Sequence, residues 1–333
     1  MAPGHRIVCY GNAFADRMDA VAALLGDAYA VERVPYGMEP EAMRARFAGA
    51  LAVIAVCTEP GLPLPEDLRL LQVPGIGWDG VRPEHVPAGA AICNVGGHET
   101  AVAEYCLAQL LDWCHGLRAL EREFRAGSWA GSSRFGAPPQ RELAGTTVGI
   151  IGYGGIGRAL ARLLRPFGVT LLVANRSPIA AEPGLDGTYG LDALVPMLER
   201  CDFAIACVAL TPETTGLLSG AALAALGPAG VLINVARGPV VDERALHAAL
   251  VANRLGGAVL DVWYKYPETL TAADPAPAHY DFAALANVVM TPHVSGWTEG
   301  TAQRRVAAIA ENIRQAASGG TLLNTVAIGT RPA

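Results

Sequence analysis

Residues 147–168 constrain the fold more than any other part of this chain. Five apolar and small residues, TVGII, have the composition of a buried strand. They run directly into the glycine-rich GYGGIG and then into RALARLLRPFG, which has a helical period. A strand, a glycine turn and a helix in immediate succession predict a dinucleotide-binding unit.

Each glycine of this turn has a physical task in such a unit. Gly152 allows the tight turn, Gly154 lets backbone amides approach a pyrophosphate, and Gly157 lets the helix pack closely on the strand. The pyrophosphate then lies at the positive N-terminus of the helix. We assign Gly155 and Ile156, the other two residues of the turn after Tyr153, to the same site.

Length and composition predict a globular protein of two domains. A chain of 333 residues exceeds what one hydrophobic core usually supports, and 52% of its residues are hydrophobic against 17% charged. The net charge of −6 gives no general attraction to nucleic acid or to an anionic membrane. We therefore expect neither as a partner.

The sequence also predicts a cytoplasmic protein. Its longest apolar stretches have the length of strands, far below the ~20 residues of a membrane-spanning helix, and the N-terminal MAPGHRIVCYGN lacks a signal-peptide core. The seven cysteines are odd in number and show no C-x-x-C spacing. Reduced, mostly buried thiols are the simplest interpretation.

Short apolar strands alternate with amphipathic stretches along the whole chain, which predicts α/β architecture with two open parallel sheets. The first third contains five strand candidates, RIVCY, YAVERV, LAVIAVC, LRLLQV and AAICNV. Residues 101–126 have a helical period, and we expect them to cross between domains. Residues 127–145, rich in Gly, Ser and Pro, are either a linker or a folded arm that reaches a partner subunit.

The second sheet is predicted to contain six strands, from TVGII through TLLVAN, FAIACVAL, VLINVA, GAVLDVW and NVVMTPH. Residues 298–318 are helical and come too late to extend this sheet, so we expect them to return to the first domain. The predicted substrate-binding domain is therefore discontinuous, 1–100 and 298–333. A Rossmann dinucleotide-binding domain, 101–297, is inserted into it, with a cleft between the two.

The residues after the second strand of the Rossmann domain favour NADP over NAD. An NAD site has an Asp or Glu about 20 residues past the glycines, whereas this chain has Asn175, Arg176 and Ser177. No carboxylate repels a 2′-phosphate there, and the guanidinium of Arg176 could pair with one. The alternative is a solvated arginine, with Asn175 alone touching a ribose hydroxyl.

Three polar residues stand on or directly after apolar strands. Arg237 follows VLINVA, where its guanidinium could hold a carboxylate and polarise a carbonyl, or form a structural ion pair with Asp242 or Glu243. His293 follows NVVMTP and is suited to acid–base work near neutral pH. Asp261, in GAVLDVW, either orients the nicotinamide carboxamide or caps the next turn.

The order of GYGGIG, ALTPETTGLLS, INVARGPVVDE, GAVLDVW and TPHVSGWT resembles that of the D-isomer-specific 2-hydroxyacid dehydrogenases over nearly the whole chain. PGIGWDGV and NVGGHETAVAEY look like that family's substrate loop and the start of its interdomain helix. The resemblance implies a flavodoxin-like substrate domain and a homodimer. It also implies hydride transfer between a nicotinamide C4 and C2 of a small 2-oxo or 2-hydroxy acid, as in glyoxylate and hydroxypyruvate reductases, without a metal.

The resemblance also implies roles for individual residues. Arg237 would bind the substrate carboxylate and the C2 oxygen, and His293 would donate the proton on reduction. The amides of Ile76 and Gly77 would hold the other side of the carboxylate. The residues implied at the nicotinamide are Val208, Ala209, Leu210, Thr214, Val235, Ala236 and Asp261.

One position departs from the family pattern. The family has a Glu five residues past Asp261 that pairs with the histidine, whereas this chain has Tyr266, and Glu268 stands two residues later. A tyrosine can hydrogen-bond an imidazole but stabilises imidazolium less than a carboxylate does. We therefore expect reduction to fade at a lower pH than usual, with Glu268 as the alternative partner. Alternatively, Tyr264, Tyr266 and Trp297 form an aromatic wall for a bulkier substrate.

Two other functions remain open from the sequence. The Arg237 guanidinium and the GIG amides form a generic oxyanion clamp, so a phosphonate or phosphite-type substrate also fits. A scaffold that senses nicotinamide nucleotides without catalysis would explain the missing Glu, but retention of Arg237 and His293 argues against it.

Overall fold

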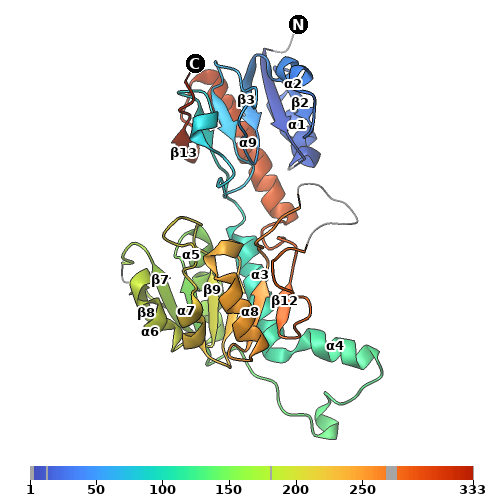
Figure 1. Ribbon diagram of the computed structural model, residues 1–333, viewed down its shortest axis with the longest axis vertical. Helices are drawn as coiled ribbons and strands as arrows, with labels where there is room; N and C mark the ends of the chain where they lie inside the picture. The colour runs from blue at the N-terminus through green and yellow to red at the C-terminus, as the bar shows by residue number, and fades with distance from the viewer. Residues whose placement is uncertain (1–3, 13, 181, 268–275, 333) are drawn as a thin grey trace. The chain divides into compact units, whose positions relative to one another are not determined.

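The computed structural model describes residues 4–12, 14–180, 182–267 and 276–332. The chain divides into two compact units. Unit 1 comprises Met1–Gly97 and Thr298–Ala333, and unit 2 comprises His98–Trp297. These limits lie three residues from the predicted boundary near residue 100 and coincide with the predicted boundary at 297/298. Each unit is an α/β layer structure around its own sheet, which is the fold class that the alternating pattern predicts (Figure 1).

The described strands of unit 1 form one sheet in the order β13-β5-β4-β3-β1-β2. Five strands are parallel, whereas β13 runs antiparallel to β5. The prediction of a purely parallel first sheet was therefore incomplete at one edge. The strands are β1 His5–Tyr10, β2 Tyr29–Val34, β3 Ala50–Ile54, β4 Leu70–Gln72, β5 Ala91–Cys93 and β13 Thr325–Ile328.

Helices cover both faces of this sheet. Helices α1, Met18–Leu25, and α9, Glu299–Ser318, pack together on one face through buried residues such as Val21 and Ile309. Helix α2, Pro40–Phe47, covers the other face with Met43 and Phe47. Both faces of the strands are therefore buried, which explains their continuous apolar sequences.

The described strands of unit 2 form a sheet in the order β12-β11-β10-β9-β6-β7-β8, parallel throughout. Six of them are the predicted strands, and the edge strand β8 was missed because its sequence, GTYG, lacks an apolar pattern. The strands are β6 Thr147–Ile151, β7 Thr170–Asn175, β8 Gly187–Gly190, β9 Phe203–Ala206, β10 Val231–Asn234, β11 Gly257–Leu260 and β12 Val288–Met290.

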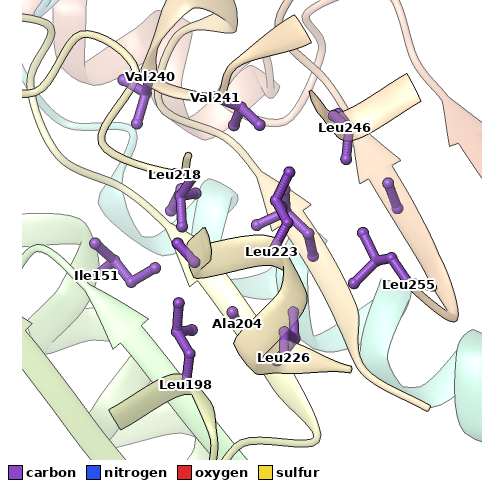
Figure 2. Packing of buried hydrophobic residues seen from close by; sticks show 14 of the residues in the cluster. Ile151, Leu198, Ala204, Leu218, Leu223, Leu226, Val240, Val241, Leu246 and Leu255 are labelled. Carbon is purple, nitrogen blue, oxygen red and sulfur yellow. The ribbon is translucent and has the colours of Figure 1, made fainter. Parts of the chain in front are cut away.

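Two hydrophobic clusters fill the two faces of this sheet. One cluster, drawn in Figure 2, packs Leu198, Leu223 and Leu246 of three helices against Ile151 and Ala204 of the strands. These helices are α6 Leu194–Leu198, α7 Gly220–Leu226 and α8 Glu243–Val251. The opposite face is covered by α3 Glu99–His115 and α5 Gly155–Leu164.

The helical period of residues 101–126 is interrupted in the structure. Helix α3 ends at Gly116, whose φ of 62° lies in the left-handed region, and α4, Leu117–Arg125, follows it. A residue in this conformation cannot continue a right-handed helix, and glycine adopts it without steric cost. The segment with helical period is therefore divided between two helices at this glycine.

No described helix of either unit is long and apolar enough to cross a membrane.

Candidate active site

The glycine turn of unit 2 has the close packing that a dinucleotide site needs. The turn joins β6 to α5, and a Cβ atom at Gly157 would lie 2.2 Å from the carbonyl oxygen of Gly152. Gly152 has a φ of 103° and packs against Val208 and Cys207 of the loop after β9. In contrast, a Cβ atom at Gly154 would meet no heavy atom within 4 Å, so this backbone is open to a ligand. The turn therefore fits a pyrophosphate at the N-terminus of α5.

This turn also lies where the strand order of unit 2 reverses. Strand β6 has β7 on one side and β9 on the other, so the loops after β6 and β9 leave the sheet in opposite directions. The loop after β9 contains Val208, Ala209 and Leu210, and it is held by Thr214, whose hydroxyl donates to the Ala209 carbonyl at 2.7 Å. Ligands of open α/β sheets bind at such switch points.

The three residues after β7 have the following contacts. The side-chain oxygen of Asn175 accepts a hydrogen bond from the Tyr153 amide at 3.1 Å, and its amide nitrogen donates to the Ser177 carbonyl. The pKa of Glu213 is lowered, first by a hydrogen bond from Thr211 and to a smaller extent by the positive charge of Arg176. The Glu213 carboxylate is therefore within electrostatic reach of Arg176.

Arg237 begins the turn after β10, next to the buried Val235 and Ala236. The buried side chain of Asn234 braces this turn by accepting from the Ala236 amide at 3.1 Å and donating to the Arg237 carbonyl at 3.0 Å. A Cβ atom at Gly238 would lie 2.3 Å from the Trp263 carbonyl oxygen, so the turn packs directly on the segment after β11.

The two carboxylates considered as structural partners of Arg237 have other contacts. Asp242 caps α8 by accepting from the Ala245 amide at 2.9 Å. Glu243 accepts a hydrogen bond from the ring of His279 at 2.7 Å. Both acidic side chains at the start of α8 therefore have hydrogen-bond partners other than Arg237.

Asp261 holds the turn that carries His293. Its carboxylate is fully buried and accepts three hydrogen bonds, from the Thr291 hydroxyl at 2.6 Å and from the amides of Val294 and Ser295 at 2.8 and 2.9 Å. Burying a carboxylate is costly unless it is hydrogen-bonded, and these bonds offset that cost. Asp261 therefore caps the turn after β12, whereas the sequence suggested a cap of the turn that directly follows Asp261 itself.

Neighbouring side chains hold the same turn from two further sides. The indole of Trp263 donates to the Thr291 carbonyl at 2.9 Å, and the hydroxyls of Tyr105 and Thr291 are 2.7 Å apart. Burial raises the pKa of Tyr105 to about 12, so this phenol keeps its proton. The sequence analysis missed these two aromatic residues and Thr291. Thr291 could have been found by the argument used for Arg237, since it is a polar residue at the end of an apolar strand.

Tyr266 contacts His293 directly. Its hydroxyl lies 3.0 Å from Nδ1 of the imidazole and accepts a hydrogen bond from the Trp263 amide at 3.2 Å. The hydroxyl can donate to a neutral imidazole, whose single ring N–H proton is then on Nε2, or accept from an imidazolium. His293 has a φ of 59°, a left-handed conformation that histidine and asparagine adopt more readily than most residues. Glu268, the alternative partner, lies outside the described residues.

These contacts connect the ends of three neighbouring strands. The turn of Arg237 follows β10, Tyr266 follows β11 and His293 follows β12, and these strands are adjacent and parallel. The structure therefore brings Arg237, Tyr266 and His293 to the same edge of one sheet. Trp297 belongs to the same unit, and its amide donates to the Val294 carbonyl at 2.9 Å.

Ile76 and Gly77 lie in unit 1, in the loop after β4. Two hydrogen bonds fix this loop to the segment after β5: the Asn94 side chain donates to the Ile76 carbonyl at 2.7 Å, and the Val95 amide donates to the Gly75 carbonyl at 3.0 Å.

Among the described residues, no group of three or more His, Cys, Asp or Glu side chains is arranged to hold a metal ion.

The chain is similar to known proteins over most of its length. Residues 107–295 match the model of the D-isomer-specific 2-hydroxyacid dehydrogenase NAD-binding domain. The chain is 31% identical over 252 residues to an (S)-sulfolactate dehydrogenase of Chromohalobacter salexigens, covering 75% of this chain and 78% of that protein. It is 34% identical over 226 residues to a hydroxyphenylpyruvate reductase of Plectranthus scutellarioides, covering 68% and 67%.

Solved structures superpose on almost the whole chain. A 2-hydroxyacid dehydrogenase of Ketogulonicigenium vulgare superposes with a TM-score of 0.80 at 26% identity, covering 99% of this chain and 100% of that one. An NADPH-dependent glyoxylate/hydroxypyruvate reductase of Sinorhizobium meliloti, in complex with NADP and malonate, superposes with a TM-score of 0.77 at 29% identity, covering 98% and 99%. The chain belongs to the family of D-isomer-specific 2-hydroxyacid dehydrogenases.

Proposed function

We propose that the protein is an NADP(H)-dependent reductase of small 2-oxo acids. The observation that carries this proposal is the arrangement of Arg237, Tyr266 and His293 at one edge of the sheet of unit 2, with Tyr266 bonded to the imidazole. A guanidinium that can clamp a carboxylate and a histidine that can transfer a proton are the two groups that reduction of a 2-oxo acid requires.

The residues act on the substrate as follows. Arg237 binds the carboxylate and polarises the C2 carbonyl, and His293 donates a proton to the oxygen at C2 as the alcohol forms. The amides of Ile76 and Gly77 hold the other side of the carboxylate, and Trp297 contacts the rest of the substrate. In the reverse direction His293 removes the hydroxyl proton.

The cofactor is proposed to bind along the carboxyl edge of the sheet of unit 2. Bound NADPH supplies the hydride. The glycine turn holds the pyrophosphate, and the residues after β7 hold the adenosine ribose with its phosphate. The residues proposed at the nicotinamide are Val208, Ala209, Leu210, Thr214, Val235, Ala236 and Asp261. Since both oxygens of Asp261 already bond the His293 turn, its effect on the nicotinamide would be mainly through that turn.

The test is oxidation of NADPH, followed by absorbance, with glyoxylate, hydroxypyruvate and larger 2-oxo acids. We expect turnover of at least one of them, and weaker activity with NADH. Tight competition by small phosphonates or oxidation of phosphite would instead indicate an oxyanion substrate of that type. Intact NADPH binding without turnover of any acid would contradict the proposal and favour the cofactor-sensing scaffold.

Replacing Arg176 tests the cofactor preference. Arg176→Ala is expected to weaken NADPH binding about tenfold and to leave NADH binding nearly unchanged, because only NADPH carries the 2′-phosphate that a guanidinium can bind. Titration of each cofactor, followed by the fluorescence of the reduced nicotinamide, measures both dissociation constants. Arg162→Ala, at an exposed position of α5, is the control. Equal loss of affinity for both cofactors would contradict this role.

Replacing Tyr266 tests the partner of the histidine. Reduction needs a protonated imidazole, so its rate falls as the pH rises past the point where His293 loses its proton. A carboxylate stabilises imidazolium more than a phenol does, so Tyr266→Glu is expected to move this falling limb upward by about one pH unit. Tyr266→Phe should not move it upward and should lower kcat, because the imidazole loses its hydrogen bond.

The measurement is kcat/KM for glyoxylate against pH, with Tyr280→Glu, at another exposed tyrosine of unit 2, as the control. A falling limb at the same pH in the parent protein and in both Tyr266 variants would show that Tyr266 does not control the histidine.

We further propose a homodimer in which the end of α4 and the segment after it contact a second copy. Phe124, Trp129 and Phe135 are each more than half exposed, yet their rings pack edge-to-face on one another with centroids 5.0 and 6.4 Å apart. A preformed exposed aromatic surface of this kind is typical of an interface. Light scattering would distinguish a dimer from a monomer of 34.6 kDa.

The seven free cysteines support the proposal of a reducing, cytoplasmic environment.

A further inference from the structure

Unit 1 has its own switch point, and a hydrogen bond spans it. Strand β1 lies between β2 and β3, so the strand order reverses at β1. This is the flavodoxin-like order, in which ligands bind outside the carboxyl ends of the strands flanking the switch. Tyr10, the last residue of β1, donates its hydroxyl proton to Oε1 of Glu59, in the loop after β3, at 2.7 Å.

The tyrosine that holds Glu59 is itself firmly held. Tyr10 is 3% exposed, and its ring packs edge-to-face on Tyr36 and Phe47 with centroids 5.0 and 5.7 Å apart. Burial, together with the hydrogen bond to Glu59, holds the pKa of Tyr10 above its usual value. The phenol therefore keeps its proton and remains a donor to the carboxylate.

Glu59 presents its negative charge at this edge. The residue is exposed, and no basic side chain in the described part of the chain forms an ion pair with it. Tyr36, after β2, is 37% exposed, and its hydroxyl lies 3.9 Å from Sγ of Cys57. The ends of three neighbouring strands thus contribute one carboxylate and one partly exposed aromatic ring to the same place.

The loop that carries Ile76 and Gly77 is bonded to the loop that carries Glu59. The Thr58 amide donates to the Gly80 carbonyl at 3.0 Å, and the Thr58 hydroxyl accepts from the Arg82 amide at 2.8 Å. A Cβ atom at Gly80 would lie 2.7 Å from the Val56 carbonyl oxygen, so the loops are in close contact. The loop that carries the Ile76 and Gly77 amides and the loop that carries Glu59 are therefore neighbours at this edge of the sheet of unit 1.

We infer that Glu59, positioned by Tyr10, selects 2-oxo acids by the charge at the far end of their side chain. The inference rests on the proposed reductase function. A substrate whose carboxylate is bound at the Ile76–Gly77 loop extends its C3 substituent along Tyr36 toward Glu59. The Glu59 carboxylate accepts hydrogen bonds from a terminal guanidinium, ammonium or hydroxyl group and repels a second anionic group.

The experiment compares 2-oxo acids with the same five-carbon backbone and different ends. These are 2-oxopentanoate, 2-oxoglutarate and 2-oxo-5-guanidinopentanoate, with glyoxylate as the substrate that has no side chain. In the parent protein we expect the highest kcat/KM among the five-carbon acids for the guanidino acid and the lowest for 2-oxoglutarate. Glu59→Gln is expected to raise kcat/KM for 2-oxoglutarate about tenfold and lower that for the guanidino acid about tenfold.

Two further variants sharpen the test. Tyr10→Phe keeps the Glu59 charge but releases the carboxylate, so the same changes should appear with smaller size and mainly in KM. Glu41→Gln, which removes an exposed carboxylate from α2, should change nothing. Glyoxylate turnover should be the same in all variants, which also shows that they are folded.

Each result decides between distinct explanations. Glyoxylate reduction with unchanged ratios among the five-carbon acids in Glu59→Gln would overturn the selection by Glu59 and leave the reductase proposal intact. Absence of turnover of every acid, with NADPH still bound, would overturn the reductase proposal and this inference with it. Equal effects of Glu59→Gln and Glu41→Gln would reduce the effect to general surface charge and would also overturn the inference.

Discussion

Replacing His293 with asparagine is expected to lower kcat for reduction of a 2-oxo acid by about 10³-fold. Asparagine adopts the left-handed conformation found at this residue, where φ is 59°, so the turn held by Asp261 can keep its shape. An amide cannot donate a proton to the forming alkoxide, which therefore has to take its proton from water. The loss should appear in kcat, with little change in NADPH affinity.

A matched control separates this loss from a general effect of removing a histidine. His279→Asn changes an exposed histidine of the same unit that bonds Glu243 and has no proposed part in the reaction. It should keep the activity of the parent protein. If His293→Asn retained more than about a tenth of the parent kcat with glyoxylate, His293 would not be the proton donor.

Replacing Arg237 is expected to lower kcat/KM about as much as replacing His293 lowers kcat. Arg237→Ala removes the group proposed to bind the substrate carboxylate and polarise its carbonyl, so kcat/KM should fall by about 10³-fold or more. Arg237→Lys keeps the charge but loses the two-pronged hydrogen bonding, and should recover only part of the activity.

The control for Arg237 is Arg244→Ala, at an exposed position of α8. Steady-state kinetics and thermal unfolding of each variant distinguish a catalytic arginine from a structural one. A lower unfolding temperature with unchanged kcat/KM in Arg237→Ala would indicate a structural ion pair and contradict the proposed role.

The sheet of unit 2 was largely predictable because its signals are local. The strand before the glycine turn and the five other predicted strands are short continuous apolar segments, and the structure has strands at all six places. β8 has only GTYG, and Gly116 interrupts an otherwise helical period. Packing decides the structure at β8, and backbone conformation decides it at Gly116. The apolar pattern of the sequence indicates neither.

Local patterns in the sequence identify candidate site residues one by one, whereas the pairing of Tyr266 with His293 was expected only through the family resemblance. Arg237 and His293 were identifiable as polar residues after apolar strands, and Tyr266 only through the resemblance, as the residue at the position of the family Glu. The bond between Tyr266 and His293 joins residues 27 positions apart, and it depends on β11 and β12 being neighbours. Sequence spacing within a loop carries no information on that pairing.

The contact between Tyr10 and Glu59 was even less predictable from the sequence. The two residues are 49 positions apart, one at the end of β1 and the other in the loop after β3, and neither belongs to a recognisable motif. Their contact follows from the strand order of unit 1, in which β1 and β3 are adjacent. A local pattern could not have predicted it.

The most direct test of the account follows the hydride itself. The protein is incubated with a 2-oxo acid and NADPH that carries deuterium at both C4 positions, and the product is analysed by mass spectrometry and chiral chromatography. The account predicts a D-2-hydroxy acid with one deuterium at C2, formed in equal amount to the NADPH consumed. NADPH consumption that yields an unlabelled product, or none, would contradict hydride transfer between the nicotinamide and C2.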